Sequence, residues 1–320
     1  MPTLAVGIPI RDDKCLDSDR SVGTFIAGTP SSFRVLLAFL SFSMNRLFLF
    51  LASPFFLSCT ATKKMNWPEN RSSITGNEFY HQAFAMKWKE RDSFAVKEIL
   101  GGNVPAFLRN LVAIDVSTTD SATDKIIRAV YYVAPDYLSI GNNRDWARIN
   151  ITPLAAQKIA DSFNCFLPTK KMVDDIYKAA KVKLEPVPMY AFRDSTPTMW
   201  HHHLIVEGQR KGRGGLIAGI QKDVVISGKI LRDPKPDRVA IYGWHKLNGD
   251  PIQPLYTGHI FWWVDYSQAI RLVYRKIKLN RRWVDYVDVL KDPVLLFYAM
   301  KSTAIFFATN IEIQISIFAH

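Results

Sequence analysis

Apolar residues recur at helical spacing in several segments of the chain. Within residues 77–113 large apolar side chains lie three or four positions apart until Gly101-Gly102 and Pro105 interrupt the pattern. Three further helices are predicted where Thr or Pro opens a stretch, at 152–163, 168–180 and 197–211. A short helix is expected over 283–291.

Shorter runs of apolar and aromatic residues predict β-strands. They lie at 130–133, 137–140, 147–151, 182–187, 216–227, 238–246, 253–265 and 268–279. Asn248-Gly249 predicts a tight hairpin turn between two of these strands. Helices followed by a run of strands indicate an α+β fold with a largely antiparallel sheet in a single main domain.

An apolar stretch near the N-terminus has the features of a signal peptide. Residues 44–59 contain one basic residue, Arg46, then an apolar run of eleven residues, then Ser58 and Cys59. Eleven residues make about 16 Å of helix, less than the ~30 Å hydrocarbon core of a bilayer. The stretch resembles a bacterial lipoprotein signal, and this resemblance implies export, lipidation of Cys59 and attachment to the membrane. The alternative is a longer anchor over 35–57, which also places the remaining chain outside the cytoplasm.

These features divide the chain into five segments. We expect a non-native upstream extension at 1–43, the signal peptide at 44–59, a tether and helical segment at 60–111, the main α+β domain at 112–293, and an apolar tail of unassigned status at 294–320. The tether is expected over 60–76, because that stretch is polar and contains Pro68.

Composition then narrows the class of protein. Apolar residues make up 48% and charged residues 22% of the 320 residues, which excludes global disorder. Three cysteines cannot build a disulfide framework, and Cys15, Cys59 and Cys165 lie too far apart in the sequence for a paired-cysteine zinc site. Nucleotide-binding loops, zinc-protease motifs and serine-hydrolase motifs do not occur in the sequence.

Positive charge and aromatic side chains are concentrated toward the C-terminal half. Lys and Arg exceed Asp and Glu by 12 in the chain, and residues 205–282 alone hold 15 bases and six acids. Residues 242–286 hold ten aromatic side chains. This combination can bind nucleic acid, but an exported protein meets anionic glycans and lipid head groups instead. We therefore predict an anionic envelope component, and no nucleic acid, as the partner. The alternative is an aromatic-rich core with a solvated basic rim.

Several short stretches in the block 135–293 are distinctive. They include Leu167-Pro168-Thr169-Lys170-Lys171-Met172, Lys222-Asp223-Val224-Val225, Tyr242-Gly243-Trp244-His245, Pro251-Ile252-Gln253-Pro254-Leu255 and Asp265-Tyr266-Ser267. In these stretches the chain resembles a family of uncharacterised exported bacterial proteins, and the resemblance implies no named activity. Ile220 and Gln268 stand where the family pattern has histidines, so any chemistry of those histidines is lost here.

His245 is the predicted catalytic base, because imidazole is the usual general base near neutral pH. Strand alternation places Tyr242 and Trp244 on one face, and Gly243 and His245 on the other. Asp223, Asp265 and Tyr242 are the predicted supporting residues. The alternative is a structural histidine beside a turn.

The predicted ligand-binding residues are Lys222, Trp244, Ser267, Gln268 and Arg271. An amide at Gln268 binds ligands but does not titrate, which favours binding over turnover. The adjacent charges of Lys222 and Asp223 lie in an apolar strand, so one must face inward, as part of a site or of a structural ion pair. His259 is expected about 23 Å from His245 in a regular hairpin, and neither a metal nor a cofactor is predicted.

These inferences give two hypotheses for function. The first is a lipid-anchored or secreted envelope protein that binds a cell-wall polymer such as peptidoglycan, with hydrolysis of that polymer as an open extension. The second is a non-catalytic binding or scaffold lipoprotein that has lost the histidines of the family.

Overall fold

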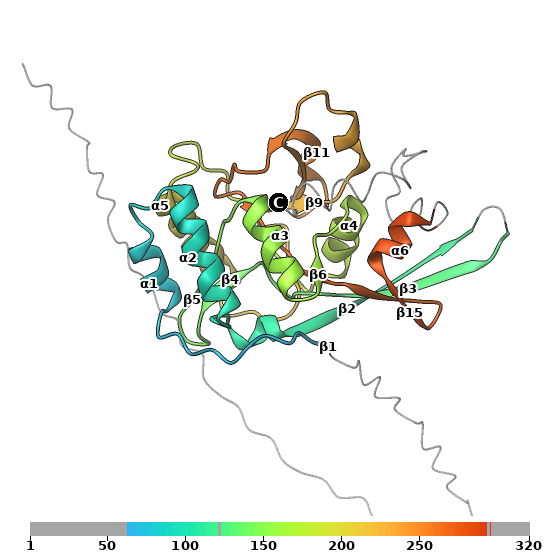
Figure 1. Cartoon of the computed structure of the whole chain (residues 1–320), viewed down its shortest axis with the longest axis horizontal. Helices are drawn as coiled ribbons and strands as arrows, with labels where there is room; N and C mark the ends of the chain where they lie inside the picture. Colours follow the sequence, from blue (N-terminus) through green and yellow to red (C-terminus); the bar gives the residue numbers. More distant parts are fainter. Residues whose placement is uncertain (1–62, 121–122, 293–294, 296–320) are drawn as a thin grey trace, which may run out of the picture. The chain divides into compact units, whose positions relative to one another are not determined.

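Helices and short strands alternate in the part of the chain that the computed structural model describes, residues 63–120, 123–292 and 295 (Figure 1). These residues belong to one unit that begins at Ser58. The predictions for 1–43, for the signal peptide with Cys59, and for the tail, apart from Leu295, lie outside the described residues. Within the described ranges, no helix has both the length and the apolar character needed to cross a bilayer.

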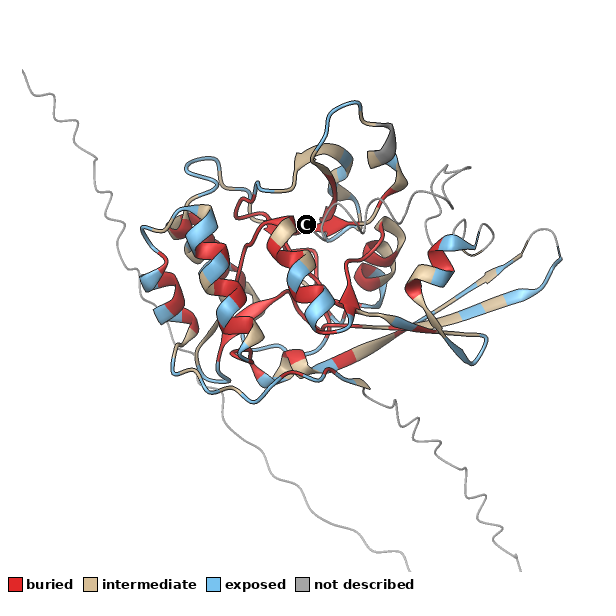
Figure 2. Cartoon of the chain, in the orientation of Figure 1, coloured by how far each residue is buried: buried red, intermediate tan, exposed pale blue. Residues whose placement is uncertain are grey.

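The larger sheet has seven antiparallel strands around the long hairpin β2–β3. Its order is β1-β2-β3-β13-β6, with β14 pairing both β3 and β15. The strands are β1 (Lys63–Lys64), β2 (Asn110–Thr119), β3 (Ile126–Val133), β6 (Cys165–Phe166), β13 (Val273–Tyr274), β14 (Lys276–Leu279) and β15 (Arg282–Asp285). The hairpin is buried at its base and increasingly exposed toward its tip (Figure 2).

The smaller sheet has four strands in the order β11-β10-β9-β12, and all but the β9–β12 pair are antiparallel. These strands are β9 (Lys222–Val225), β10 (Arg238–His245), β11 (Pro251–Ile260) and β12 (Gln268–Ala269). Two further pairs complete the strands, the antiparallel β4 (Ser139–Gly141) with β5 (Trp146–Arg148) and the parallel β7 (Val182–Lys183) with β8 (Ile217–Ala218). The α+β class with a mostly antiparallel sheet is therefore confirmed, although β2 and β3 precede four of the helices.

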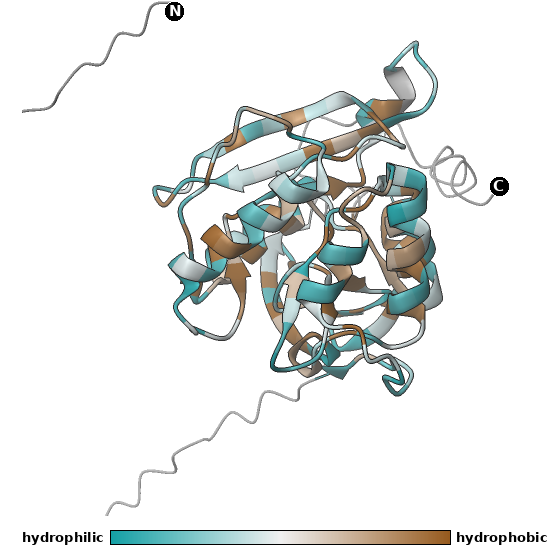
Figure 3. Cartoon of the chain, turned by 90° about the vertical axis from the view of Figure 1, so that its left-hand side faces the viewer, coloured by the Kyte–Doolittle hydropathy of each residue, from teal (hydrophilic) through white to brown (hydrophobic). Residues whose placement is uncertain are grey.

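Five of the six α-helices in the described residues, all except α2 (Trp88–Leu100), follow a residue whose side chain accepts a hydrogen bond from an amide of the first turn. The side chains of Thr152, Thr169 and Ser195 accept hydrogen bonds from backbone N–H groups of their own helices. The helices are α1 (Gly76–Gln82), α2 (Trp88–Leu100), α3 (Pro153–Ser162), α4 (Lys170–Ala179), α5 (Thr196–Arg210) and α6 (Tyr286–Lys291), with 3-10 turns η1 (Ala106–Arg109) and η2 (Gly228–Arg232). Several helices carry hydrophilic residues along one side and hydrophobic residues along the other (Figure 3).

The helix expected over 283–291 begins later than predicted. Residues 282–285 pair with β14 as strand β15, and Asp285 then caps α6 with its side chain. Sequence periodicity could not resolve this boundary, because four residues are too few to separate a strand from a first helical turn.

The prediction of a tether over residues 60–76 is wrong from Lys63 onward, because this segment is part of the folded domain. Lys63 and Lys64 pair with β2, and the Met65 N–H donates to the Arg109 carbonyl. Met65 and Trp67 are buried, and the Trp67 ring stacks on Phe163 at 4.1 Å between centroids. The domain thus includes residues that the sequence assigned to a tether and helical segment at 60–111, because two large apolar side chains in a polar stretch find partners distant in sequence.

Candidate functional site

His245 occupies the last position of β10, where the strand leaves its regular geometry. Gly243 and Trp244 adopt left-handed backbone, with φ of 109° and 59°. This interrupts the alternation of side chains, so Tyr242 and His245 lie together, with ring centroids 5.7 Å apart and planes at 82°. The prediction that these two residues face opposite sides is therefore wrong. A non-glycine residue such as Trp244 in this region is uncommon and is often found at functional sites.

Asp174 of α4 is the residue that joins Tyr242 and His245. Its Oδ1 accepts from the Tyr242 hydroxyl at 2.7 Å and lies 3.2 Å from His245 Nε2. Its Oδ2 accepts from Lys170 Nζ at 2.8 Å, one helical turn earlier. We call Asp174, His245, Tyr242, Lys170 and Tyr177 the Asp174–His245 site. Sequence analysis missed Asp174, and only its place in a predicted helix with Lys170 four residues before it could have drawn attention to it.

The Asp174 carboxyl is held in its ionised form. Partial burial raises its pKa, but the hydrogen bonds from His245, Lys170 and Tyr242 outweigh burial and bring the pKa to about 2. Burial, together with the hydrogen bond to Asp174, raises the pKa of Tyr242 to about 12, so the phenol remains a donor. A permanently charged carboxylate on one ring nitrogen orients the imidazole for a proton transfer at the other.

Tyr177 and Gly243 enclose the imidazole. The Tyr177 ring stacks on His245 at 4.5 Å between centroids and 20° between planes. A Cβ at Gly243 would lie 3.6 Å from His245 Nδ1, so this nitrogen faces backbone that carries no side chain. In the part of the chain that the structure describes, Nδ1 makes no hydrogen bond. When Nε2 donates to Asp174, the Nδ1 lone pair can accept a proton.

The Asp174–His245 site lies at a surface pocket. Its lining includes Lys178, Lys183, Leu247 and Asn248 in addition to Asp174, Tyr177 and His245. Lys183 Nζ lies 4.8 Å from the centroid of the Tyr177 ring. The His245 side chain itself is only 4% exposed, whereas that of Asp174 is 27% exposed. The pocket therefore presents two lysines, an aromatic ring and a carboxylate above a nearly buried imidazole.

Asp223 lies on the same side of the smaller sheet as Tyr242, its partner in register on β10. The Tyr137 hydroxyl donates to its Oδ2 at 3.2 Å, while its buried Oδ1 has no partner among the described residues. Burial raises the pKa of Asp223 to about 6, although the charges of Arg271 and His245 oppose this rise. The structure thus brings Asp223 into the electrostatic surroundings of His245, without a direct hydrogen bond between them.

The raised pKa of Asp223 predicts a specific dependence of stability on pH. The folded state binds this proton more tightly than the unfolded state, so stability falls as pH rises through the interval from 3.8 to about 6. At 1.36 kcal/mol per pKa unit, the loss is about 3 kcal/mol. Asp223→Asn keeps an acceptor for Tyr137 and cannot ionise. We expect it to match the parent protein near pH 4 and to be about 3 kcal/mol more stable near pH 7.5, measured by urea unfolding.

Asp265→Asn is the matched control for this measurement. Burial raises the pKa of Asp265, but Lys222, Ser267 and Arg193 lower it overall. A lowered pKa contributes stability that is present at neutral pH and lost toward acid, so this variant should be weakened most near pH 7.5. Equal effects of Asp223→Asn at pH 4 and pH 7.5 would show that Asp223 titrates normally.

Asp265 belongs to a different group of side chains and does not contact His245. Its Oδ2 accepts from Lys222 Nζ at 3.2 Å and from Arg193 at 2.9 Å, and its Oδ1 accepts from Ser267 Oγ at 2.7 Å. The predicted support of His245 by Asp265 is corrected accordingly. The reason is strand geometry, because Lys222 and Asp223 are consecutive in β9 and point to opposite faces of the sheet.

The observed register separates His245 and His259 by nearly the distance that the sequence predicted. His259 pairs with Val239, six positions from His245 along β10, which corresponds to about 20 Å. β11 ends at Ile260 and the chain turns, so Asp265 and Lys222 both act electrostatically on His259. Among the described residues, no group of three or more His, Cys, Asp or Glu side chains could hold a metal ion.

The five predicted ligand-binding residues are all buried: Lys222, Trp244, Ser267, Gln268 and Arg271. Arg271 donates to the carbonyls of Ala134 and Ile217, so its guanidinium braces backbone. Gln268 donates weakly to the Trp263 carbonyl at 3.5 Å, and Ile220 packs in an apolar cluster. A polymer at the surface would not touch these side chains. The prediction that they bind the ligand directly is therefore corrected, because they lie beneath the surface.

Comparisons with known proteins add no relative. No protein-family model, no curated protein and no solved structure matches the chain. The functional argument therefore rests on the sequence and on the geometry described above.

Proposed function

We propose that the protein is a lipid-anchored or secreted protein of the cell envelope that binds an anionic cell-wall polymer, such as peptidoglycan, at the Asp174–His245 site. The observation that carries this proposal is the pocket in which Lys178 and Lys183 flank Tyr177 above His245. Two cations attract the carboxylates or phosphates of such a polymer. The extracellular address is inferred from the signal-like sequence at 44–59.

Exposed aromatic side chains supply further surface for a sugar polymer. Of the ten aromatic residues in 242–286, four are at least about one third exposed: Tyr256, Trp262, Trp263 and Trp283. Tyr190 and Phe192, which sequence analysis did not single out, are 89% and 81% exposed. An aromatic ring exposed to water can pack its face against a sugar ring. Four of the other six, Tyr242, Trp244, Tyr266 and Tyr286, are buried, so the alternative of an aromatic-rich core applies to them.

Hydrolysis at the same site is a second candidate function. The specific observation in its favour is the Asp174–His245 contact, which orients an imidazole whose Nδ1 makes no hydrogen bond within the described residues. Such a pair can take a proton from water attacking a glycosidic or amide bond, and return it to the leaving group. Binding and hydrolysis make different demands on the side chains, so variants separate them.

The test uses purified peptidoglycan sacculi incubated with the purified protein. Bound protein is measured by co-sedimentation, and released fragments by mass spectrometry. We expect the double variant Lys178→Glu, Lys183→Glu to lose at least about tenfold in binding at low salt, because it reverses two charges at the pocket. His245→Gln should keep binding and release at least about a hundredfold less product, the usual contribution of a general base.

The matched control is Lys125→Glu, which reverses an exposed charge near the tip of the β2–β3 hairpin. It should bind like the parent protein. Binding that survives the double reversal would reject the pocket as the polymer site. Fragments released equally by the parent protein and His245→Gln would reject the imidazole as the base. If the parent protein binds the sacculi and neither it nor any variant releases fragments, the non-catalytic form of the proposal stands.

A further inference from the structure

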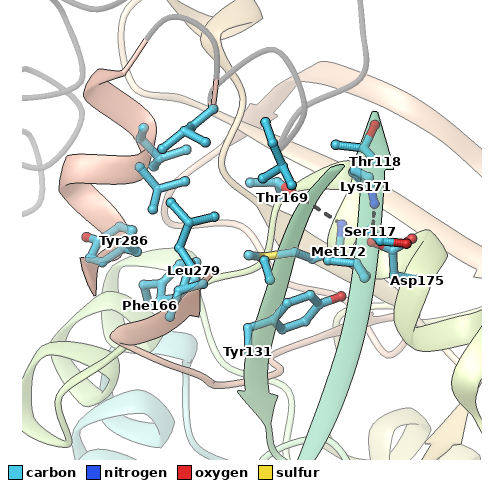
Figure 4. Close-up of a pocket in the computed structure, with 17 residues that line it drawn as sticks. Ser117, Thr118, Tyr131, Phe166, Thr169, Lys171, Met172, Asp175, Leu279 and Tyr286 are labelled. Atoms are coloured by element: carbon cyan, nitrogen blue, oxygen red, sulfur yellow. Dashed lines mark hydrogen bonds and ion pairs between the residues drawn. The ribbon is translucent and has the colours of Figure 1, made fainter. Parts of the chain in front are cut away.

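An apolar cavity lies away from the Asp174–His245 site, between the β2–β3 hairpin and helices α4 and α6. Its walls include Val116, Ala129, Phe166, Met172 and Leu290, and its volume is about 80 Å³ (Figure 4). This is roughly half of a 150 Å³ cavity that binds benzene, so it can hold a few carbon atoms. Well-packed interiors leave few spaces larger than a water molecule, and an apolar cavity can bind a small apolar group.

A buried phenol in the cavity wall lacks a hydrogen-bond partner. Tyr131 is 2% exposed, and its hydroxyl has no partner in the part of the chain that the structure describes. Burial and the negative charge of Asp175 raise its pKa, so the hydroxyl keeps its proton and remains a donor. An unsatisfied buried donor is unfavourable, and a ligand oxygen in the cavity would satisfy it.

A positively charged side chain, that of Lys171, lies at the polar edge of the same cavity. Lys171 and Asp175 both line it, together with Ser117 and Thr118, and the Lys171 ammonium is paired with Asp175 (Figure 4). The Lys171 side chain is 24% exposed, so this edge is reachable from solvent. The cavity thus combines an apolar interior, one free hydroxyl donor and one accessible ammonium group.

We propose that this cavity binds the hydrocarbon chain of a short aliphatic carboxylic acid, whose carboxylate accepts hydrogen bonds from Tyr131 and Lys171. The apolar walls take the chain, the phenol gains its missing acceptor, and the Lys171 ammonium, which keeps Asp175 as one partner, donates a further hydrogen bond to the carboxylate. A neutral chain would form no ionic contact with Lys171, and a lone inorganic anion would leave the apolar walls unfilled. The inference does not depend on polymer binding at the Asp174–His245 site.

The experiment titrates the full chain with straight-chain carboxylates from acetate to octanoate by isothermal calorimetry. Each methylene that enters the cavity should tighten binding about fourfold, and the gain should stop once the cavity is full. Octanol, with the same chain length as octanoate and no charge, should bind at least about tenfold more weakly. Affinity that does not change with chain length, or equal binding of octanol, would overturn the proposal.

Tyr131→Phe and Tyr132→Phe form a matched pair of variants. Tyr131 lines the cavity, whereas its neighbour Tyr132 stacks on Trp283 instead. Removing the Tyr131 hydroxyl should weaken octanoate binding about tenfold with no loss of folding, and removing that of Tyr132 should change nothing. Ala129→Leu, which fills the cavity, should abolish binding. Unchanged octanoate affinity in both Tyr131→Phe and a folded Ala129→Leu would place the ligand elsewhere and reject the cavity.

Discussion

Replacing Arg148 by methionine is expected to lower the free energy of unfolding by about 3–5 kcal/mol. The Arg148 guanidinium donates to both oxygens of Asp136, at 2.9 and 2.6 Å, and to Glu207 at 2.8 Å. The side chains of Arg148 and Asp136 are only 3% and 2% exposed. Methionine fills a similar volume without charge, so the loss would come mainly from a buried carboxylate left without its cation.

Urea unfolding at neutral pH measures this effect, and a double variant makes it interpretable. Asp136→Leu added to Arg148→Met removes the stranded carboxylate, and should recover part of the lost stability, since apolar replacement of a buried pair is often tolerated. The single variant could instead lose less than about 1 kcal/mol, with no recovery in the double variant. That result is typical of exposed ion pairs, and it would show that the Arg148–Asp136 pair is not buried in solution.

Trp67→Ala is expected to lower the free energy of unfolding by a similar amount, about 3–5 kcal/mol. Trp67 is 6% exposed and its ring is stacked on Phe163, which follows helix α3. Truncation to alanine would remove that contact and leave a cavity between the segment 63–75 and the core. The measurement is again the urea midpoint, with fluorescence from the remaining tryptophans as the probe.

Trp283→Ala is the control for this truncation, because Trp283 is 50% exposed. Its removal should cost much less than that of Trp67. A negligible effect of Trp67→Ala would restore the idea that the segment before α1 is a tether. A large effect would establish that the folded domain starts near Lys63, which changes where a stable fragment should be cut.

Local rules predicted most of the helices. Thr152 followed by Pro153, and Thr169 after Pro168, mark helix starts that the structure has at the same positions. These signals work from sequence because a capping side chain and the amide it satisfies lie within three residues. The α+β class followed for a similar reason, since the alternation of helical and strand patterns is local.

The smaller sheet shows where local rules end. The hairpin at Asn248-Gly249 forms near its predicted register, with His245 opposite Pro251. Register shifts farther along β10 and the left-handed residues Gly243 and Trp244 then change which side chains share a face. Strict alternation assigned Tyr242 and His245 to opposite faces, and the structure brings them onto one carboxylate.

The sequence alone determined the fold class and the starts of α3, α4 and α5, and it proposed His245, Tyr242 and Asp223 as members of one site. Only the tertiary structure identified Asp174 as the partner of Tyr242 and His245, and moved Asp265 to a separate ion pair with Lys222. The physical reason is distance along the chain. Capping and strand alternation act between residues a few positions apart, whereas Asp174 and His245 meet across 71 positions, through the packing of α4 on β10.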